Sequence, residues 1–151
     1  MNPWETDRVR RSTSPRINAR IDHVIAEAIA TYSRQSVAAV TRRIDELERE
    51  WDVERLLQVN ASSLALTGVL LAGAGHRRWL ALSGGVLGFL LLHGLKGWCP
   101  PLPVLRRLGV RTRAEIDRER FALKFLRGDF DRVRKPSGEI NLQALVQAAE
   151  M

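Results

Sequence analysis

The stretch that decides the fold reads VNASSLALTGVLLAGAG (59–75), HRR (76–78) and WLALSGGVLGFLLLHGL (79–95). Neither long run contains Asp, Glu, Lys or Arg. An α-helix rises about 1.5 Å per residue, so each run spans roughly 25 Å, slightly less than a bilayer's hydrocarbon core of ~30 Å. The pattern predicts an integral membrane helical hairpin with spans at about 59–75 and 79–95. The alternative is a soluble hairpin buried in a globular core.

Charged residues lie on both sides of this apolar block and are almost absent from it. The 151 residues include 24 Lys+Arg and 17 Asp+Glu, yet residues 61–95 carry only Arg77 and Arg78. Residues 1–20 and 96–151 are net basic, and residues 21–60 are net acidic. The apolar block excludes disorder over the whole length, and a single cysteine excludes a disulfide scaffold. The charged N-terminus has no apolar run typical of a secretory signal peptide.

The residues that flank the two runs predict how the hairpin lies in the membrane. Trp79, Lys96 and Trp98 are typical interface anchors, because amphipathic rings and long basic side chains favour the headgroup level. Basic residues also set orientation, and nine flank the hairpin while two lie in its loop. Both termini are therefore expected in the cytoplasm, with the turn at 76–78 outside. The flanking basic residues are Arg42, Arg43, Arg49, Arg55, Lys96, Arg106, Arg107, Arg111 and Arg113.

Small residues recur within the hairpin at helical spacing. Gly84 and Gly88 form a GxxxG pair, and Gly68 with Ala72 forms a small-xxx-small pair. In lipid, helices associate through close backbone approach at such positions. Two interpretations stay open: these residues pack the two helices of one hairpin together, or they form a homodimer face.

Two polar residues, Asn60 and His93, lie at nearly the same distance from the turn. Antiparallel helices of equal rise would place them at the same depth, near the cytoplasmic face. Polar side chains at that depth usually face a neighbouring helix, so we predict a contact between them, direct or through one water. The alternative is that His93 only reaches the headgroup region beside Lys96.

The rest of the chain predicts an all-α protein. Residues 16–57 read as a long amphipathic helix with a kink near 31–36, and Asp52 could act as a local N-cap. Three prolines in 100–103 predict an extended path. Residues 111–128 predict a basic amphipathic helix, with a Thr112/Glu115 capping box and a stop at Gly128, suited either to anionic lipid headgroups or to solvent. Residues 1–15 are expected to be disordered, and 129–151 to form a linker and a short C-terminal helix.

Residues 60–109 resemble the two-helix membrane domain of the YgaP-like family, formerly a domain of unknown function. The resemblance rests on the glycine-rich hairpin that ends in Gly94-Leu95-Lys96-Gly97-Trp98-Cys99-Pro100, followed by Leu108-Gly109-Val110. It implies a bacterial inner-membrane location, sometimes with a fused cytoplasmic rhodanese domain. The only cysteine is Cys99, inside the hairpin motif, so this chain has no rhodanese active-site loop. The family supplies no catalytic residue.

Motifs for catalysis are missing from the sequence, which predicts a protein that is not an enzyme. There is no GxSxG, Walker-type loop, HExxH or CxxC, and the three histidines lack ligand spacing, so neither cofactor nor metal is expected. Cys99 is a possible reactive thiol if nearby Lys96 lowers its pKa; the alternative is a small apolar side chain packed at a turn.

Three classes of function fit these observations. The preferred one is a membrane-anchored scaffold that binds an unknown cytoplasmic protein, with a homodimer through the hairpin or the N-terminal helix as a further candidate assembly. The first alternative is a redox or sulfur-relay accessory that uses Cys99. The second is a nucleic-acid binder, suggested by a pI near 10.9. Nucleic acid is not expected, because membrane proteins carry excess positive charge on the cytoplasmic side and no aromatic-interleaved basic stripe occurs.

Overall fold

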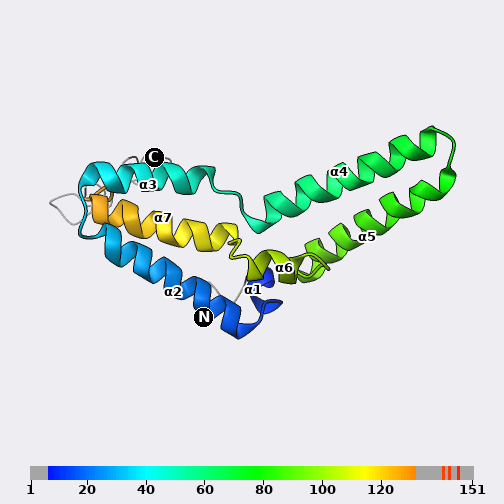
Figure 1. Ribbon diagram of the computed structural model, residues 1–151. Helices are drawn as coiled ribbons and strands as arrows, with labels where there is room; N and C mark the ends of the chain where they lie inside the picture. The colour runs from blue at the N-terminus through cyan, green and yellow to red at the C-terminus, as the bar shows by residue number, and fades with distance from the viewer. Residues whose placement is uncertain (1–6, 132–140, 142, 144–145, 147–151) are drawn as a thin grey trace. The chain divides into compact units, whose positions relative to one another are not determined.

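The computed structural model describes residues 7–131 together with Asn141, Gln143 and Val146, and its regular elements are helices (Figure 1). No strand occurs in this part of the chain, which agrees with the predicted all-α class. The chain divides into two compact units. The first unit comprises Met1–Asp22 and Trp51–Glu115, and the second comprises His23–Glu50 and Ile116–Met151.

Two long helices, α4 (Val53–Gly73) and α5 (Leu80–Lys96), dominate the first unit and lie side by side (Figure 1). A 3₁₀ turn at Arg77–Trp79 precedes α5. At Gly68, α4 comes close to the 3₁₀ turn and the start of α5, and an added Cβ would lie 2.9 Å from the Trp79 carbonyl oxygen. Nearby, the buried Ser83 hydroxyl donates to the Ala65 carbonyl oxygen over 2.8 Å. Gly68 therefore permits the close approach that the small-residue pattern predicted for one helix.

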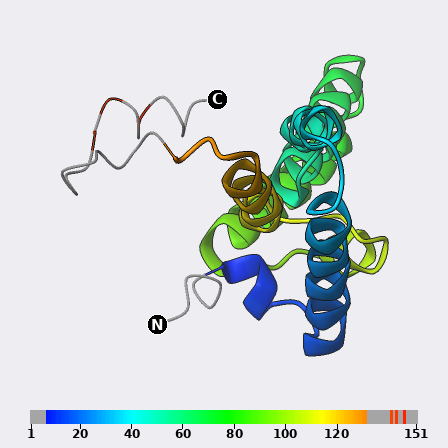
Figure 2. The same ribbon diagram turned by 90° about the vertical axis from the view of Figure 1, so that its left-hand side faces the viewer.

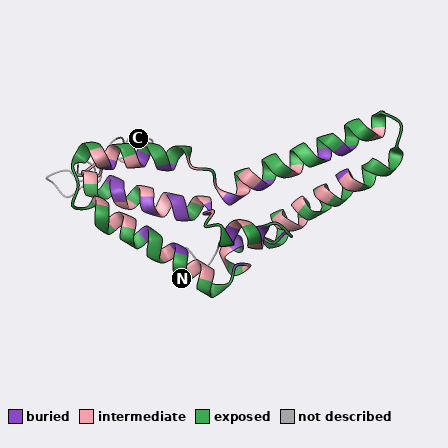
Figure 3. Ribbon diagram, in the orientation of Figure 1, coloured by how far each residue is buried: buried purple, intermediate pink, exposed green. Residues whose placement is uncertain are grey.

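The apolar residues of α4 and α5 are mostly exposed (Figure 3). Leu70 is 65% exposed, Leu91 65% and Leu95 69%. Two stretches of the chain, Val37–Gly73 and Arg77–Lys96, each contain an 18-residue window long and apolar enough to cross a membrane. A soluble core helix would bury such residues, so the alternative of a buried soluble hairpin receives no support from the burial of these helices.

The first unit has its apolar core at the end of α4 and α5 that contains Val53 and Lys96, here called the base. The core consists of Val9, Val53, Leu57, Cys99 and Leu102. Val9 belongs to α1 (Arg8–Arg11), whose first turn is capped by Asp7. The expectation that 1–15 is disordered is therefore wrong for the described residues from Asp7 onward, because the cap and the burial of Val9 hold them.

The proline-rich segment also differs from the prediction. An extended path was expected after Trp98, but α6 (Leu102–Arg107) begins directly after Pro101. Proline is compatible with the first turn of a helix, where its missing N–H has no intrahelical partner to lose. Gly97 ends α5 with φ at +72°, and an added Cβ there would also collide with the backbone of Arg8. Glycine is thus required in the GWCP segment both for its conformation and for contact with α1.

The second unit is built around the contact between α3 (Val37–Arg49) and α7 (Arg113–Arg127), whose residues from Ile116 onward belong to it. These helices lie next to each other in both views (Figures 1 and 2). Tyr32, from α2 (Pro15–Tyr32), packs against their shared core. That core consists of Val40, Ile44, Leu47, Ile116 and Leu123.

The long N-terminal helix predicted for 16–57 is interrupted twice. The first break follows Tyr32, at the predicted kink, and Ser36 then caps α3. The second break separates Arg49 from Val53, and the Asp52 carboxylate accepts from the Arg55 N–H over 2.7 Å. A single continuous helix is thus wrong, while the predicted Asp52 cap is confirmed. The linker and C-terminal helix predicted for 129–151 lie almost wholly outside the described residues.

Candidate functional site at the base of α4 and α5

A buried carboxylate, Glu115, organises the polar side of the base. Its Oε1 accepts from Arg10 at 2.6 Å and from Arg106 at 2.7 Å, and its Oε2 accepts from Arg106 at 2.6 Å. The Thr112 N–H donates to Oε2 at 2.8 Å and the Glu115 N–H donates to Thr112 Oγ1 at 3.3 Å, so the predicted capping box is present. One residue thus caps α7 and pairs with two arginines from distant parts of the sequence.

The electrostatics of this cluster are balanced by further groups. Burial alone would raise the pKa of the Glu115 carboxyl, but the hydrogen bonds from Arg106, Thr112 and Arg10 hold its pKa below the usual value. Arg106 has no exposed side-chain surface and also donates to Asn18 Oδ1 over 2.9 Å. Arg10 donates to both oxygens of Asp22 at 3.1 and 2.8 Å. Removal of one partner would therefore leave a buried charge uncompensated, which is destabilising.

Sequence reasoning found only the capping role of Glu115. Arg106 entered the prediction merely as one of the basic residues near the second span. Arg10 and Asp22, which complete the cluster, were not singled out. No local spacing links residues 10, 22, 106 and 115, so only the folded chain brings them together.

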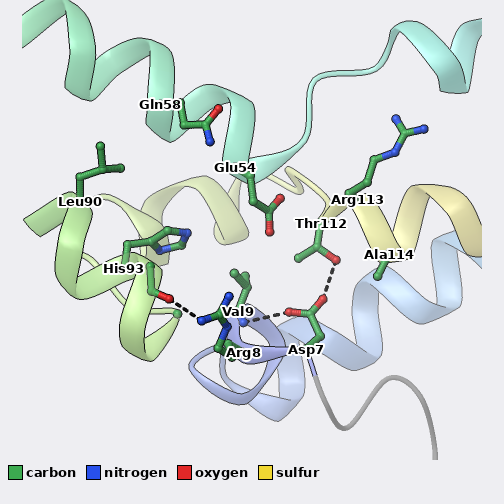
Figure 4. Close-up of a pocket in the computed structure, with 12 residues that line it drawn as sticks. Asp7, Arg8, Val9, Glu54, Gln58, Leu90, His93, Thr112, Arg113 and Ala114 are labelled. Carbon is green, nitrogen blue, oxygen red and sulfur yellow. Dashed lines mark hydrogen bonds between the residues drawn. The ribbon is translucent and has the colours of Figure 1, made fainter.

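Beside this cluster lies a polar cavity of about 640 Å³ in the first unit (Figure 4). Glu54 enters it from α4 and His93 from α5, while α1 contributes Arg8. Arg8 donates through Nη1 to the Gly94 carbonyl oxygen, and Asp7 accepts from the Thr112 hydroxyl at 2.8 Å. The remaining lining residues are Val9, Gln58, Leu90, Gly94, Gly97, Thr112, Arg113 and Ala114.

Two polar atoms in this cavity are buried and lack hydrogen-bond partners within the described part of the chain. They are Glu54 Oε2 and His93 Nδ1. Figure 4 shows both side chains pointing into the same space, close to Arg8. A buried acceptor left without a donor costs about 1–3 kcal/mol, and more if it is charged. A further hydrogen-bonding partner in this cavity would therefore stabilise both atoms.

An apolar cavity of about 340 Å³ lies between α4, α5 and the segment 99–101. Leu90 and His93 line both cavities, so the two are adjacent. Apart from Asn60, His93 and Cys99, every lining residue is apolar: Leu57, Ala61, Leu64, Val86, Phe89, Leu90, Pro100 and Pro101. Each volume falls in the range of small-molecule sites, roughly 300–1,000 Å³.

The predicted polar pair, Asn60 and His93, is brought to the lining of this apolar cavity. The two side chains do not form a direct hydrogen bond: the Asn60 amide donates to the Leu56 carbonyl oxygen of its own helix at 2.9 Å. A contact through one water stays a prediction.

Cys99 is 3% exposed and packs in the core of the first unit. Burial raises the pKa of its thiol, opposite to the lowering that a reactive thiol beside Lys96 would need. The position fits the alternative of a small apolar side chain packed at a turn.

The four small residues predicted to pack helices together separate into two pairs. Gly68 lies at the contact of α4 and α5, and Ala72 one turn further on is half-buried. A Cβ added at Gly84 or Gly88 would meet nothing within 4 Å, so these glycines do not pack the two helices together.

The predicted interface anchors, Trp79, Lys96 and Trp98, are exposed at the ends of α5. Among the described residues, no group of three or more His, Cys, Asp or Glu side chains could hold a metal ion.

Comparison with known proteins adds no relative to this picture. No family model, curated protein or solved structure matches the chain.

Proposed function

We propose that the chain is a small, non-enzymatic protein of the bacterial inner membrane that anchors a cytoplasmic scaffold. In this proposal α4 and α5 form a membrane-spanning hairpin of the YgaP-like type. The observation that carries it is the exposure of large apolar side chains along both helices. Water would penalise that surface by roughly 25 cal/mol per Å², whereas lipid solvates it.

The second unit is the part that would bind a cytoplasmic partner. Its helix α7 buries Ile116 and Leu123 but leaves Phe121 42% and Phe125 72% exposed. Phe121 and Phe125 are four residues apart and share a face of the helix. Exposed aromatic residues are typical of protein interfaces, where aromatic side chains are enriched. Lipid headgroups are the competing partner for this face, because α7 is also rich in Arg and Lys.

The alternative function in redox or sulfur relay has less support. It requires a Cys99 thiolate that a partner can reach, and the thiol is buried with a raised pKa.

Membrane fractionation tests the proposal directly. Membranes from cells that produce the full chain are washed with alkaline carbonate and then extracted with mild detergent. We expect the chain to stay in the washed membranes and to dissolve only with detergent. Recovery in the soluble fraction without detergent would remove the proposal.

Orientation is tested in the same cells with single cysteines in a Cys99→Ser background. A membrane-impermeant thiol reagent should label His76→Cys in intact cells, because the turn is proposed to face outward. Ser36→Cys should be labelled only after lysis. Labelling of Ser36→Cys in intact cells, with His76→Cys protected, would show the opposite orientation.

A further inference from the structure

We infer that the two adjacent cavities of the first unit form one binding site for a lipid that carries a primary-amine headgroup, of the phosphatidylethanolamine type. The inference rests on the proposed function as a membrane protein, and it names a lipid that this protein would bind. The apolar cavity would receive part of an acyl chain, and the polar cavity would receive the headgroup. His93 and Leu90 line both cavities and mark the junction between them.

The apolar cavity fits an acyl chain in position and in lining. It opens between α4 and α5, and its walls are aliphatic or aromatic except at Asn60, His93 and Cys99. An acyl chain of a neighbouring lipid could enter from the bilayer without crossing water. The cavity leads toward the base, where headgroups of the cytoplasmic leaflet would lie in the proposed orientation.

The polar cavity fits an ammonium group because of its two unpartnered atoms. Glu54 Oε2 accepts hydrogen bonds, and His93 Nδ1 does so in the appropriate neutral tautomer. An ammonium group has three N–H donors and no acceptor, so it can satisfy both atoms at once. Burial disfavours the charged form of Glu54, and the nearby carboxylates of Asp52 and Asp7 disfavour it further, so a cation is the neighbour that would stabilise the Glu54 carboxylate.

Charge complementarity extends to the lipid phosphate. Arg8 lies beside His93 in the polar cavity (Figure 4), and it donates a hydrogen bond to the Gly94 carbonyl oxygen. A guanidinium binds phosphate through several parallel N–H groups. A headgroup with ammonium toward Glu54 and phosphate toward Arg8 thus matches the order of charges in the cavity. A choline headgroup carries the same charge but has no N–H donor.

The test is competition among lipids for the purified full chain. The protein is equilibrated in mixed micelles with equimolar phosphatidylethanolamine, phosphatidylcholine and phosphatidylglycerol of identical acyl chains, and bound lipid is counted by native mass spectrometry. We expect phosphatidylethanolamine to exceed phosphatidylcholine by about tenfold, the scale of one charge-assisted hydrogen bond. Equal occupancy of the three lipids, or preference for the anionic one, would overturn the inference.

Two variants with matched controls locate the site. Glu54→Gln keeps shape and should abolish the preference for the amine, while Glu46→Gln, on the surface of α3, should not. Ala61→Phe fills the apolar cavity and should lower occupancy by all lipids, whereas Leu66→Phe, exposed on the same helix, should not. Selectivity that survives Glu54→Gln would also overturn the inference.

Fractionation of every variant separates this inference from the proposed function. A chain that stays in washed membranes but binds the three lipids equally disproves only the lipid site. A wild-type chain found in the soluble fraction disproves the membrane proposal, and the lipid site falls with it.

Discussion

The α4–α5 pair and the α3–α7 pair both consist of helices packed side by side, yet they bury their apolar residues differently. The α3–α7 contact buries five large aliphatic residues, and Leu47, Ile116 and Leu123 have no exposed surface. The α4–α5 contact contains small buried residues, Gly68, Ala65 and Ser83, while many leucines of the two helices, such as Leu70 and Leu91, are exposed. The first arrangement is what water selects, because burial of apolar area stabilises it. The second is what lipid permits, since close backbone approach replaces that driving force.

The largest effect should come from the buried charges at the base, where Glu115 pairs with Arg10 and Arg106. Arg106→Ala leaves Glu115 buried with one arginine partner fewer, and we expect a loss of about 3–5 kcal/mol in the free energy of unfolding. The measurement is denaturant unfolding in mild detergent, followed by circular dichroism.

The adjacent Arg107 gives the matched control for that variant, because it lies on the same helix but is exposed. Arg107→Ala should change the free energy of unfolding by less than about 0.5 kcal/mol. Equal losses for the two variants would show that the Glu115 cluster does not stabilise the first unit.

The second prediction compares one leucine from each helix pair. Leu123→Ala removes a fully buried side chain from the α3–α7 core and should cost about 2–5 kcal/mol. Leu91→Ala removes a side chain that is 65% exposed on α5 and should cost well under 1 kcal/mol in detergent. If Leu91→Ala proved as costly as Leu123→Ala, the exposed face of α5 would have to be covered by protein.

The third prediction concerns glycines on the two faces of the α4–α5 pair. Gly68→Ala places a methyl group against the Trp79 carbonyl and Ser83, so we expect a loss of about 1–3 kcal/mol. Gly88→Ala meets open space and should be neutral or slightly stabilising, because alanine favours a helix by about 0.8–1.0 kcal/mol over glycine. The free energy of unfolding of each variant is measured in mild detergent.

The same glycine variants also test whether Gly84 and Gly88 form a homodimer face. Crosslinking in membranes would reveal whether a second copy packs on the face of Gly84 and Gly88. A dimer lost in Gly88→Ala, with the stability of the monomer unchanged, would support the homodimer interpretation. An unchanged crosslinking pattern would count against it.

The sequence predicted the helices and their caps well where the signal is local. The α4 and α5 helices follow from uninterrupted apolar runs, and the caps at Asp52 and Thr112 follow from side chains that act within one turn. It failed for α1 and α6, which are short helices held by burial of Val9 and Leu102 in a core made of distant segments. The candidate site was predicted only in part, through Asn60, His93 and Cys99. Its other groups, Arg8 and Glu54, line the same cavity as His93 only in the folded chain. No spacing in the sequence predicts that these three residues lie close together.

The smallest effect concerns Asn60 and His93, the one polar pair that links α4 to α5 across the apolar cavity. Both side chains line that cavity without a direct hydrogen bond, so any coupling must pass through a water or a bound ligand. Interhelical hydrogen bonds in membrane proteins average only ~0.6 kcal/mol, and we expect a coupling no larger than this. A double-mutant cycle with Asn60→Ala and His93→Ala, read by unfolding in detergent, measures the coupling. Because independent sites add to within roughly 0.3–0.5 kcal/mol, the cycle needs replicate precision better than that margin. Strict additivity would mean that the two side chains do not interact.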